Sequence, residues 1–215
     1  MPISITASSP SEQNPGHLTG VFASDKGSKF HVAILCFLWY NGGNHKRKYA
    51  LLPKNGSGME ITVKNMKKLT ICMISSSGGH YEQLRMLRPL GEKHELFWVT
   101  EKTDYKANAD FYLTATGSND PMFPLKMLGN SFKTLGFWLK KRPDVVITTG
   151  AFIAVPACLL AKLLGKKVIY IESFARVTDG NRTGKLIYKF ADLFIYQWEQ
   201  LAQIYPNGVY GGGIY

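Results

Sequence analysis

The chain has 215 residues, of which 45% are hydrophobic and 19% charged, and 26 Lys and Arg against 15 Asp and Glu give a net charge of +11. This composition supports a packed core and excludes a wholly disordered chain. The positive charge indicates an anionic partner. Nucleic acid, anionic lipid and phosphorylated carriers all meet that description, so charge alone does not choose among them.

The three cysteines, Cys36, Cys72 and Cys158, are far apart and lack the spacing of metal ligands. Cys72 and Cys158 lie in apolar runs, where buried thiols are common. We therefore expect no disulfide framework, no metal site and a reducing compartment.

No apolar segment reaches the roughly 18–20 residues that span a bilayer. The run at 32–40 is too short, and the run at 151–164 contains Pro156 and Lys162, which fit a buried helix better. The N-terminus, MPISITASSPSEQNPG, lacks the basic and apolar regions of a secretory signal. We expect a protein that lies on a membrane rather than across it.

Residues 1–65 differ from the rest, with clusters of Ser, Pro, Gly and Asn and one coherent apolar run. Residues 29–52 predict a hairpin, because the NGGN turn separates two strand-like segments. Residues 53–58 (PKNGSG) indicate a flexible linker. We treat 1–65 as an N-terminal extension without an assigned function, and the sequence leaves open whether it is native.

From residue 66 to 215, short apolar runs alternate with helical patterns. This rhythm predicts an α/β domain with an open, mostly parallel sheet and helices on both faces. The expected strands are 69–75, 95–100, 110–116, 144–150, 167–173 and 192–198, and the expected helices follow SSGGH and cover 124–141, 155–164 and 182–191.

Polar and glycine residues follow three of these strands, at 75–80 (SSSGGH), 148–150 (TTG) and 172–173 (ES). Ligands of open α/β sheets bind beyond the carboxyl ends of the strands, so these ends are the candidate site. Glu172 either binds hydroxyl groups of a ligand or caps the helix or turn that follows it.

The SSSGGH turn is the most informative of the three. Gly78 and Gly79 let the backbone approach a ligand, and the next helix offers unpaired N–H groups. Ser77 and His80 can bind phosphate oxygens or sugar hydroxyls. With no carboxylate beside His80 in the sequence, we expect it to position a ligand rather than catalyse. The alternative is a plain strand–helix turn.

A dinucleotide site is the weaker interpretation, because G-x-G-x-x-G is absent. Glu101 stands where a ribose-binding acid would, roughly 20 residues after the glycines. A stand-alone nucleotide- or NAD-binding enzyme therefore stays an alternative. The phosphate-loop motif is also missing, which argues against an ATPase.

The helix at 124–141 combines an apolar face with a basic stripe. It predicts either a membrane-surface helix or a crossover helix packed on the sheet with a solvated lysine edge, and both can hold. The apolar face comprises Leu125, Leu128, Phe132, Leu135 and Leu139, widened by Met127, Phe137 and Trp138. The stripe comprises Lys126, Lys133 and Lys140, continued by Lys141 and Arg142.

Four blocks, ICMISSSGGHYEQL, VVITTGAFIAVPACLLAKLLGKKVIYIES, ADLFIYQWEQL and YPNGVYGGGIY, occur in this order. Together they resemble the acceptor-side, membrane-associated subunit of the eukaryotic dolichol-linked N-acetylglucosamine transferase. They resemble still more closely its bacterial relatives in capsular and exopolysaccharide synthesis. The resemblance covers residues 66–215.

This resemblance implies a Rossmann-like domain equivalent to the N-terminal half of a GT-B glycosyltransferase, the half that binds the lipid-linked acceptor. It implies that Ser77, Gly78, Gly79 and His80 form the acceptor-side glycine-rich loop. It further implies that Thr149, Gly150 and the region of Glu172 form later strand ends of the same site. The eukaryotic subunit carries an N-terminal membrane anchor, for which this sequence offers no convincing match.

A domain of about 150 residues has room for one doubly wound sheet. Glycosyl transfer needs a donor and an acceptor site held in reactive geometry, so a catalytic UDP-sugar-binding partner is expected. By the resemblance, the tail at 205–215 is the docking segment for that partner; a frayed terminus is the alternative. Its candidate docking residues are Tyr210, Gly211, Gly212, Gly213 and Tyr215.

We therefore predict a helper subunit at the cytoplasmic face of a membrane, peripheral and not catalytic alone. It binds a polyprenyl-diphosphate-linked sugar acceptor, an anionic membrane surface and a catalytic glycosyltransferase subunit. We expect no cofactor and no metal. We also expect no nucleic-acid partner, because no aromatic and basic platform or base-reading motif is present.

Overall fold

The computed structural model describes residues 51–54, 58–61, 68–105, 107–117 and 120–214. The chain divides into two compact units, Met1–Lys67 and Lys68–Tyr215.

In the first unit, strands β1 (Leu51–Lys54) and β2 (Gly58–Ile61) pair antiparallel, with Leu51 opposite Ile61. The interpretation of 53–58 as a linker is therefore wrong at both of its ends. The sequence between the strands contains Asn-Gly, the dipeptide that most favours tight hairpin turns. Most of the hairpin predicted at 29–52 lies outside the described residues.

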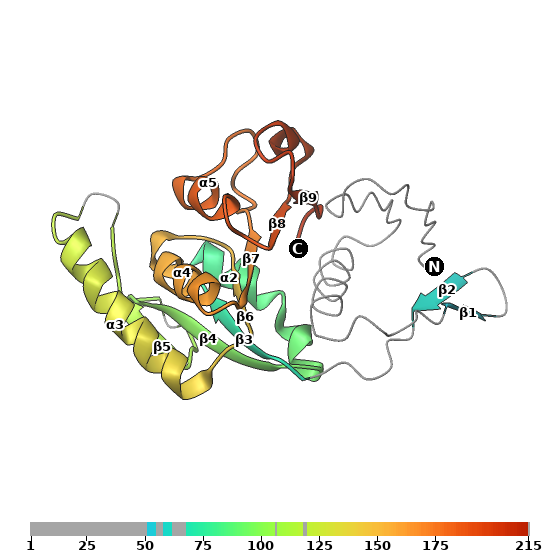
Figure 1. Cartoon of the computed structure of the whole chain (residues 1–215). Coiled ribbons are helices and arrows are strands. Elements are labelled where there is room, and N and C mark those ends of the chain that lie inside the picture. Colours follow the sequence, from blue (N-terminus) through green and yellow to red (C-terminus); the bar gives the residue numbers. More distant parts are fainter. Residues whose placement is uncertain (1–50, 55–57, 62–67, 106, 118–119, 215) are drawn as a thin grey trace. The chain divides into compact units, whose positions relative to one another are not determined.

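The second unit is built on a seven-stranded sheet with the order β5-β4-β3-β6-β7-β8-β9 (Figure 1). All six strand pairs are parallel, as predicted. The strands are β3 (Thr70–Ile74), β4 (Glu95–Lys102), β5 (Phe111–Thr114), β6 (Val145–Thr148), β7 (Lys167–Ile171), β8 (Leu193–Tyr196) and β9 (Val209–Tyr210).

The strand order places a topological switch point between β3 and β6. From β3 the chain runs outward to β4 and β5, then returns to β6 beside β3 and runs the other way to β9. Loops that leave β3 and β6 diverge to opposite faces, which opens a crevice at their carboxyl ends. The SSSGGH and TTG segments follow these two strands, so the fold brings them together.

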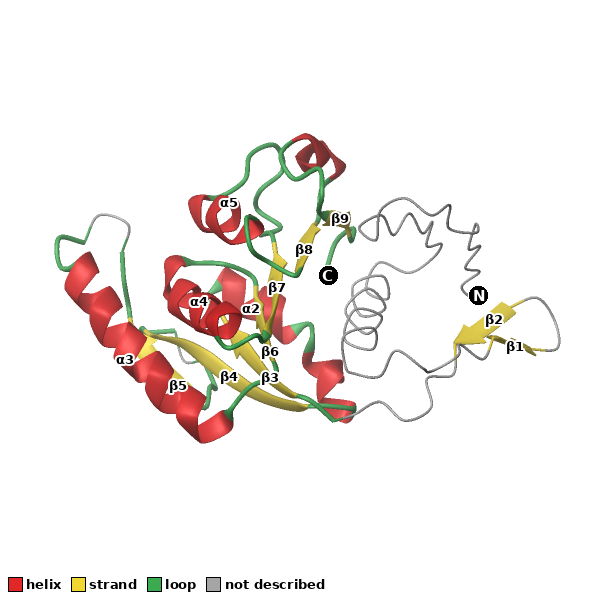
Figure 2. Cartoon of the chain, viewed as in Figure 1, coloured by secondary structure: helices red, strands yellow, loops and turns green. Residues whose placement is uncertain are grey.

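Helices cover both faces of the sheet, as predicted. Figure 2 shows α3 and α4 side by side on one face, and α2 lies on the other. The helices are α2 (Gly79–Arg85), α3 (Phe123–Lys141), α4 (Val155–Leu163) and α5 (Arg182–Tyr188), with short 3₁₀ turns η1 (Arg88–Glu92), η2 (Phe152–Ala154) and η3 (Glu199–Gln203).

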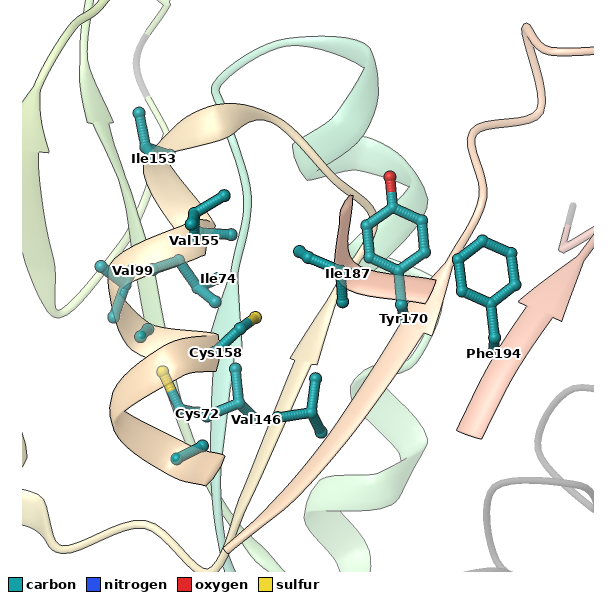
Figure 3. Packing of buried hydrophobic residues seen from close by; sticks show 14 of the residues in the cluster. Cys72, Ile74, Val99, Val146, Ile153, Val155, Cys158, Tyr170, Ile187 and Phe194 are labelled. Carbon is teal, nitrogen blue, oxygen red and sulfur yellow. The ribbon is translucent and has the colours of Figure 1, made fainter. Parts of the chain in front are cut away.

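The core lies between the sheet and α4, where Cys72 of β3 and Cys158 of α4 are both fully buried (Figure 3). Both are free thiols, as the sequence predicted. Burial raises the pKa of Cys158 to about 12 and that of Cys72 well above its ordinary value. Neither thiol is therefore reactive near neutral pH, because the thiolate is the nucleophile.

The side of helix α3 that packs on the domain carries both polar and aromatic residues. Its buried residues are Asn130, Thr134, Phe137 and Trp138. The Asn130 side chain accepts from Thr114 N at 2.8 Å and donates to Thr114 O at 2.9 Å, which caps the end of β5. This pairing makes the inward asparagine favourable, because both amide groups are satisfied.

The predicted apolar stripe of α3 consequently faces outward. Its members, Leu125, Leu128, Phe132, Leu135 and Leu139, are all exposed, and Phe132 keeps 68% of its surface. The assignment of Trp138 to the membrane surface is wrong, since only 4% of it is exposed. Trp138 packs in the core.

Candidate functional site

The glycine turn begins the site at the carboxyl end of β3. Gly78 adopts φ +77, a conformation that side chains other than glycine rarely take, and its carbonyl accepts from Glu82 N at 3.0 Å as α2 begins. A Cβ added at Gly78 or Gly79 would meet no atom within 4 Å. The turn therefore leaves room for a ligand beside its backbone.

His80 links this turn to the end of β6. Its Nδ1 lies 2.8 Å from the carbonyl oxygen of Thr149, and the Thr149 hydroxyl donates to the carbonyl oxygen of His80 at 2.7 Å. Because a carbonyl can only accept, Nδ1 carries the proton, and Nε2 of the neutral ring is left as an acceptor. Burial lowers the pKa of His80, and the nearby charge of Arg176 lowers it further against the opposing effect of the Thr149 bond.

Gly150 lets the imidazole of His80 lie against the β6 turn. A Cβ at this position would stand 2.8 Å from the Tyr170 hydroxyl, 3.4 Å from His80 Cε1 and 3.6 Å from Asn181 Nδ2. Gly150 also adopts φ +113, and Ala151 follows at φ +74. Strained backbone of this kind is often concentrated at functional sites.

Glu172, at the end of β7, is 0% exposed. It accepts hydrogen bonds from Tyr205 Oη at 2.7 Å, Asn181 Nδ2 at 2.6 Å and Ser173 N at 2.9 Å. Burial raises its pKa, and these hydrogen bonds oppose the rise. The prediction that Glu172 itself contacts the acceptor does not fit this geometry, because a fully buried carboxylate offers no surface to a ligand.

The alternative prediction for Glu172, a structural cap, fits instead. Asn181 is the N-cap of α5, where its side-chain oxygen accepts from Gly184 N at 2.5 Å. The carboxylate of Glu172 orients this asparagine by accepting the hydrogen bond from its Nδ2. Glu172 therefore fixes the loop between β7 and α5 against the crevice.

That loop carries Arg176, which sequence reasoning missed. Arg176 N donates to Ser173 O at 2.9 Å in the turn after β7, and the guanidinium pairs with Asp179 at 3.0 Å. Its positive charge is near enough to affect the pKa values of both His80 and Glu172. The sequence did offer a signal for Arg176, because it is a basic residue four positions after Glu172, the acid at the end of a predicted strand.

Glu101, the residue of the ribose-binding alternative, bonds within the protein. It accepts from Ser77 Oγ and from Thr116 N, each at 3.4 Å. Thr103 in turn donates to Ser77 Oγ at 3.0 Å. Glu101 thus supports the glycine turn from the β4 side.

The tail after β9 packs on its own domain. Gly211 N donates to Tyr196 O at 2.9 Å, and Ile214, 2% exposed, donates from its N to Gln197 Oε1 at 3.0 Å. The frayed-terminus alternative is therefore wrong for 211–214. Tyr210 is exposed beside this segment, in β9, the last of the described strands in the order of the sheet.

The described part of the chain holds neither a cluster of metal ligands nor a membrane-spanning helix. Among these residues, no three or more His, Cys, Asp or Glu side chains gather as metal ligands would. None of the helices within the same ranges is long and apolar enough to cross a bilayer.

Comparison with known proteins identifies the family. Residues 122–214 match the family "Oligosaccharide biosynthesis protein Alg14 like". The human UDP-N-acetylglucosamine transferase subunit ALG14 is 31% identical over 190 residues, which cover 73% of this chain and 87% of the human protein. This chain belongs to the Alg14 family. The Candida albicans ALG14 subunit is 32% identical over 184 residues, covering 72% of this chain and 84% of that protein.

The family resemblance inferred from the four sequence blocks is confirmed. The matched range of this Alg14-family chain contains Gly150, Glu172, Arg176 and the tail, and the glycine turn precedes it. The relatives just named are eukaryotic, so the closer resemblance to bacterial proteins of capsular and exopolysaccharide synthesis stays a prediction.

Solved structures confirm the fold. MurG of Acinetobacter baumannii superposes with a TM-score of 0.52 at 18% identity, over 61% of this chain and 42% of the MurG chain. The UDP-GlcNAc 2-epimerase of Methanocaldococcus jannaschii gives a TM-score of 0.51 at 16% identity, over 63% of this chain and 41% of the epimerase. This Alg14-family domain therefore spans less than half of either protein's length.

Proposed function

We propose that this chain is the acceptor-side subunit of a two-component UDP-N-acetylglucosamine transferase in lipid-linked oligosaccharide synthesis. The supporting observation is that the described residues of the second unit hold one seven-stranded sheet, and that the superposition covers 61% of this chain but only 42% of the MurG chain. The relatives carry the word "subunit" in their names. A donor site is then the task of a second polypeptide.

The acceptor's diphosphate is proposed to bind at the switch point. Gly78 and Gly79 expose backbone there, Ser77 offers a hydroxyl, and Thr149 and Gly150 form the opposite wall through their contacts with His80. A neutral His80 accepts a hydrogen bond at Nε2 from a hydroxyl of the acceptor sugar.

Arg176 supplies the charge that a diphosphate requires. A guanidinium can contact two phosphate oxygens at once, and such charge-assisted bonds are about twice as strong as neutral ones. Its exposed pairing with Asp179 is weak enough to exchange for a phosphate contact. Glu172 takes the role of a positioning residue that holds the loop carrying Arg176.

The outward face of α3 is proposed to contact the membrane. Exposed Leu125, Phe132 and Leu139 follow one another along the helix, which suits insertion below the lipid headgroups. Lysines flank this ridge on the side of β5: Lys133 bonds to Thr114, and Lys140 lies 5.9 Å from the centre of the Phe111 ring. Anionic lipid fits these lysines and Lys126 better than a neutral surface does.

The catalytic subunit is proposed to dock at the tail, around Tyr210, Gly211, Gly212, Gly213 and Tyr215. An exposed tyrosine and a strand edge offer apolar area and backbone hydrogen-bonding groups to a second chain. The packed position of 211–214 supports this proposal, because an ordered segment loses less entropy on binding.

Co-expression with the catalytic subunit of the same organism tests the function. We expect the two chains to co-purify and to transfer N-acetylglucosamine from UDP-GlcNAc to a polyprenyl-diphosphate-linked sugar. Each chain alone should give no product. Robust transfer by this chain alone would refute the helper role.

A further inference from the structure

Two buried amide side chains, Gln197 and Gln83, connect the C-terminal tail to helix α2. Ile214 N donates to Gln197 Oε1 at 3.0 Å, and Gln197 Nε2 donates to Gln83 Oε1 at 3.3 Å. Gln83 lies on α2, the helix that begins at the glycine turn. A single side chain thus lies between the last described residue and the turn's own helix.

Both glutamines are buried and well bonded, with 2% of Gln197 and 5% of Gln83 exposed. Gln197 Nε2 also donates to Glu172 O at 2.9 Å, and Gln83 Oε1 also accepts from Phe174 N at 3.2 Å. In a buried network each bond fixes the rotamers that the next one needs. Removing the donor at Ile214 would leave a buried amide oxygen without that partner, which is unfavourable.

A second contact reaches the same place. A Cβ on Gly213 would lie 3.5 Å from Phe174 Cε2, so the tail passes against this ring. The Phe174 ring packs on Trp198, with centroids 4.8 Å apart, and the indole N–H donates to Phe174 O at 2.7 Å. Phe174 itself bonds to Gln83 through its amide. Tail, β7 loop and α2 therefore share one packed junction.

We propose that the seating of segment 211–214 holds α2 and its glycine turn in place, with Gln197 and Gln83 as positioning residues. This inference rests on the proposed function, in which the turn binds the acceptor and the tail receives the catalytic subunit. Binding of the catalytic subunit to the tail then also orders the glycine turn. Binding at the two places is coupled because both favour the same arrangement of the two glutamines.

Hydrogen exchange of the α2 amides in the full chain tests this coupling. Gly212→Ala loosens the tail: Gly212 has φ +73, and an added Cβ would meet no atom within 4 Å, so the substitution adds strain without a clash. Gly165→Ala is the matched control, because Gly165 has φ +67 and an added Cβ there would also meet no atom within 4 Å. Gly165 follows α4 and is not part of the tail. Amides of β3 serve as the reference for global unfolding.

We expect α2 exchange to rise about fivefold in Gly212→Ala over Gly165→Ala, the factor that corresponds to about one hydrogen bond. In a Gln197→Met background, Gly212→Ala should add nothing further. Gln83→Met breaks the same link from the other side and should give the same result. Equal α2 exchange in the two glycine variants, or an undiminished Gly212→Ala effect in both Met backgrounds, would overturn the proposal.

These measurements need neither acceptor nor catalytic subunit. Absent sugar transfer in the co-expressed pair would therefore contradict the proposed function and leave the exchange result standing. Uncoupled exchange would contradict the role of Gln197 and Gln83 and leave the transfer assay standing.

Discussion

Thr149 and His80 bond to each other twice across the switch point of the sheet. The Thr149 hydroxyl donates to the His80 carbonyl at 2.7 Å, and the His80 ring lies 2.8 Å from the Thr149 carbonyl. This double link joins the first residues of α2 to the end of β6. The two segments proposed to bind the acceptor are thus held as one rigid wall.

Thr149→Val should weaken the link between these two segments, because it removes the hydroxyl that bonds to His80. It keeps the side-chain shape, so packing changes little. We expect a loss of about 1 kcal/mol of unfolding free energy, the typical value for one hydrogen bond, and weaker acceptor binding. Urea unfolding and acceptor titration measure the two effects. Thr149→Ser retains the hydroxyl and is the control; equal losses in both variants would exclude the hydrogen bond as the cause.

Gly150→Ala should be far more harmful than Gly79→Ala. A Cβ at Gly150 would stand 2.8 Å from the Tyr170 hydroxyl on backbone with φ +113, whereas one at Gly79 meets nothing within 4 Å. Strained backbone of this kind costs about 1–3 kcal/mol. We expect Gly150→Ala to lower both stability and acceptor binding. Thermal unfolding that is unchanged by Gly150→Ala would contradict this geometry.

His80 should make the chain less stable in mild acid. Burial lowers its folded-state pKa from the ordinary 6.5, so below that pH the unfolded chain binds its proton more readily than the folded chain. The free energy of unfolding then falls as pH drops from about 6.5 toward the folded pKa, and this histidine adds no pH dependence above that range.

Urea unfolding between pH 5 and 8 measures this effect, with His80→Gln as the comparison. The pKa of His94 is also lowered by burial, so only the difference between the two chains belongs to His80. We expect a shallower acid slope in His80→Gln. Identical slopes would show that His80 does not contribute.

Glu172→Ala should destabilise the chain by about 3 kcal/mol or more. It leaves the Tyr205 hydroxyl and Ser173 N buried without their acceptor and removes one of the two bonds of Asn181 Nδ2, and each buried group without a partner costs about 1–3 kcal/mol. Glu172→Gln keeps the shared oxygen for Asn181 and Ser173 and should cost far less. Denaturant unfolding of both variants decides; a stable Glu172→Ala chain would argue against a positioning role.

Phe132→Ser and Trp138→Ala should separate membrane binding from folding on α3. Phe132 is exposed, so its loss should change stability by no more than about 0.5 kcal/mol while reducing binding to anionic vesicles. Trp138 is buried, and its truncation should cost about 3–5 kcal/mol. Vesicle sedimentation that is unaffected by Phe132→Ser together with Leu125→Ser and Leu139→Ser would contradict the membrane face.

The sheet could be predicted from the sequence because its central strands, β3, β6 and β7, are buried on both faces. Runs such as TICMI and VVIT are apolar at nearly every position, and this pattern is typical of parallel strands with both faces covered. Strand β9 has two residues, Val209 and Tyr210, and carries too little pattern to be recognised.

The orientation of α3 could not be predicted in the same way. Its apolar stripe is the usual sign of a core-facing side, yet Asn130 faces inward because it bonds the backbone of Thr114, sixteen residues earlier. A contact of that kind is set by tertiary structure and leaves no periodic signal. The error on Trp138 has the same origin.

The strand-end rule predicted that the loops after β3 and β6 meet, and the structure brings His80 and Thr149 together there. The rule could not show that Glu172 is buried, because the side chains that bond to its carboxylate, Asn181 and Tyr205, belong to later loops whose path the sequence does not reveal. Nor could it select Arg176, whose nearness to His80 depends on the path of the loop after β7.

Equilibrium binding to the isolated chain tests the division of labour between the two subunits most directly. UDP-GlcNAc and a polyprenyl-diphosphate-linked sugar would be titrated separately in the presence of detergent. We predict saturable binding of the diphosphate-linked sugar, weakened by Arg176→Ala, and no saturable binding of UDP-GlcNAc. Saturable UDP-GlcNAc binding without any binding of the lipid-linked sugar would contradict an acceptor-side role.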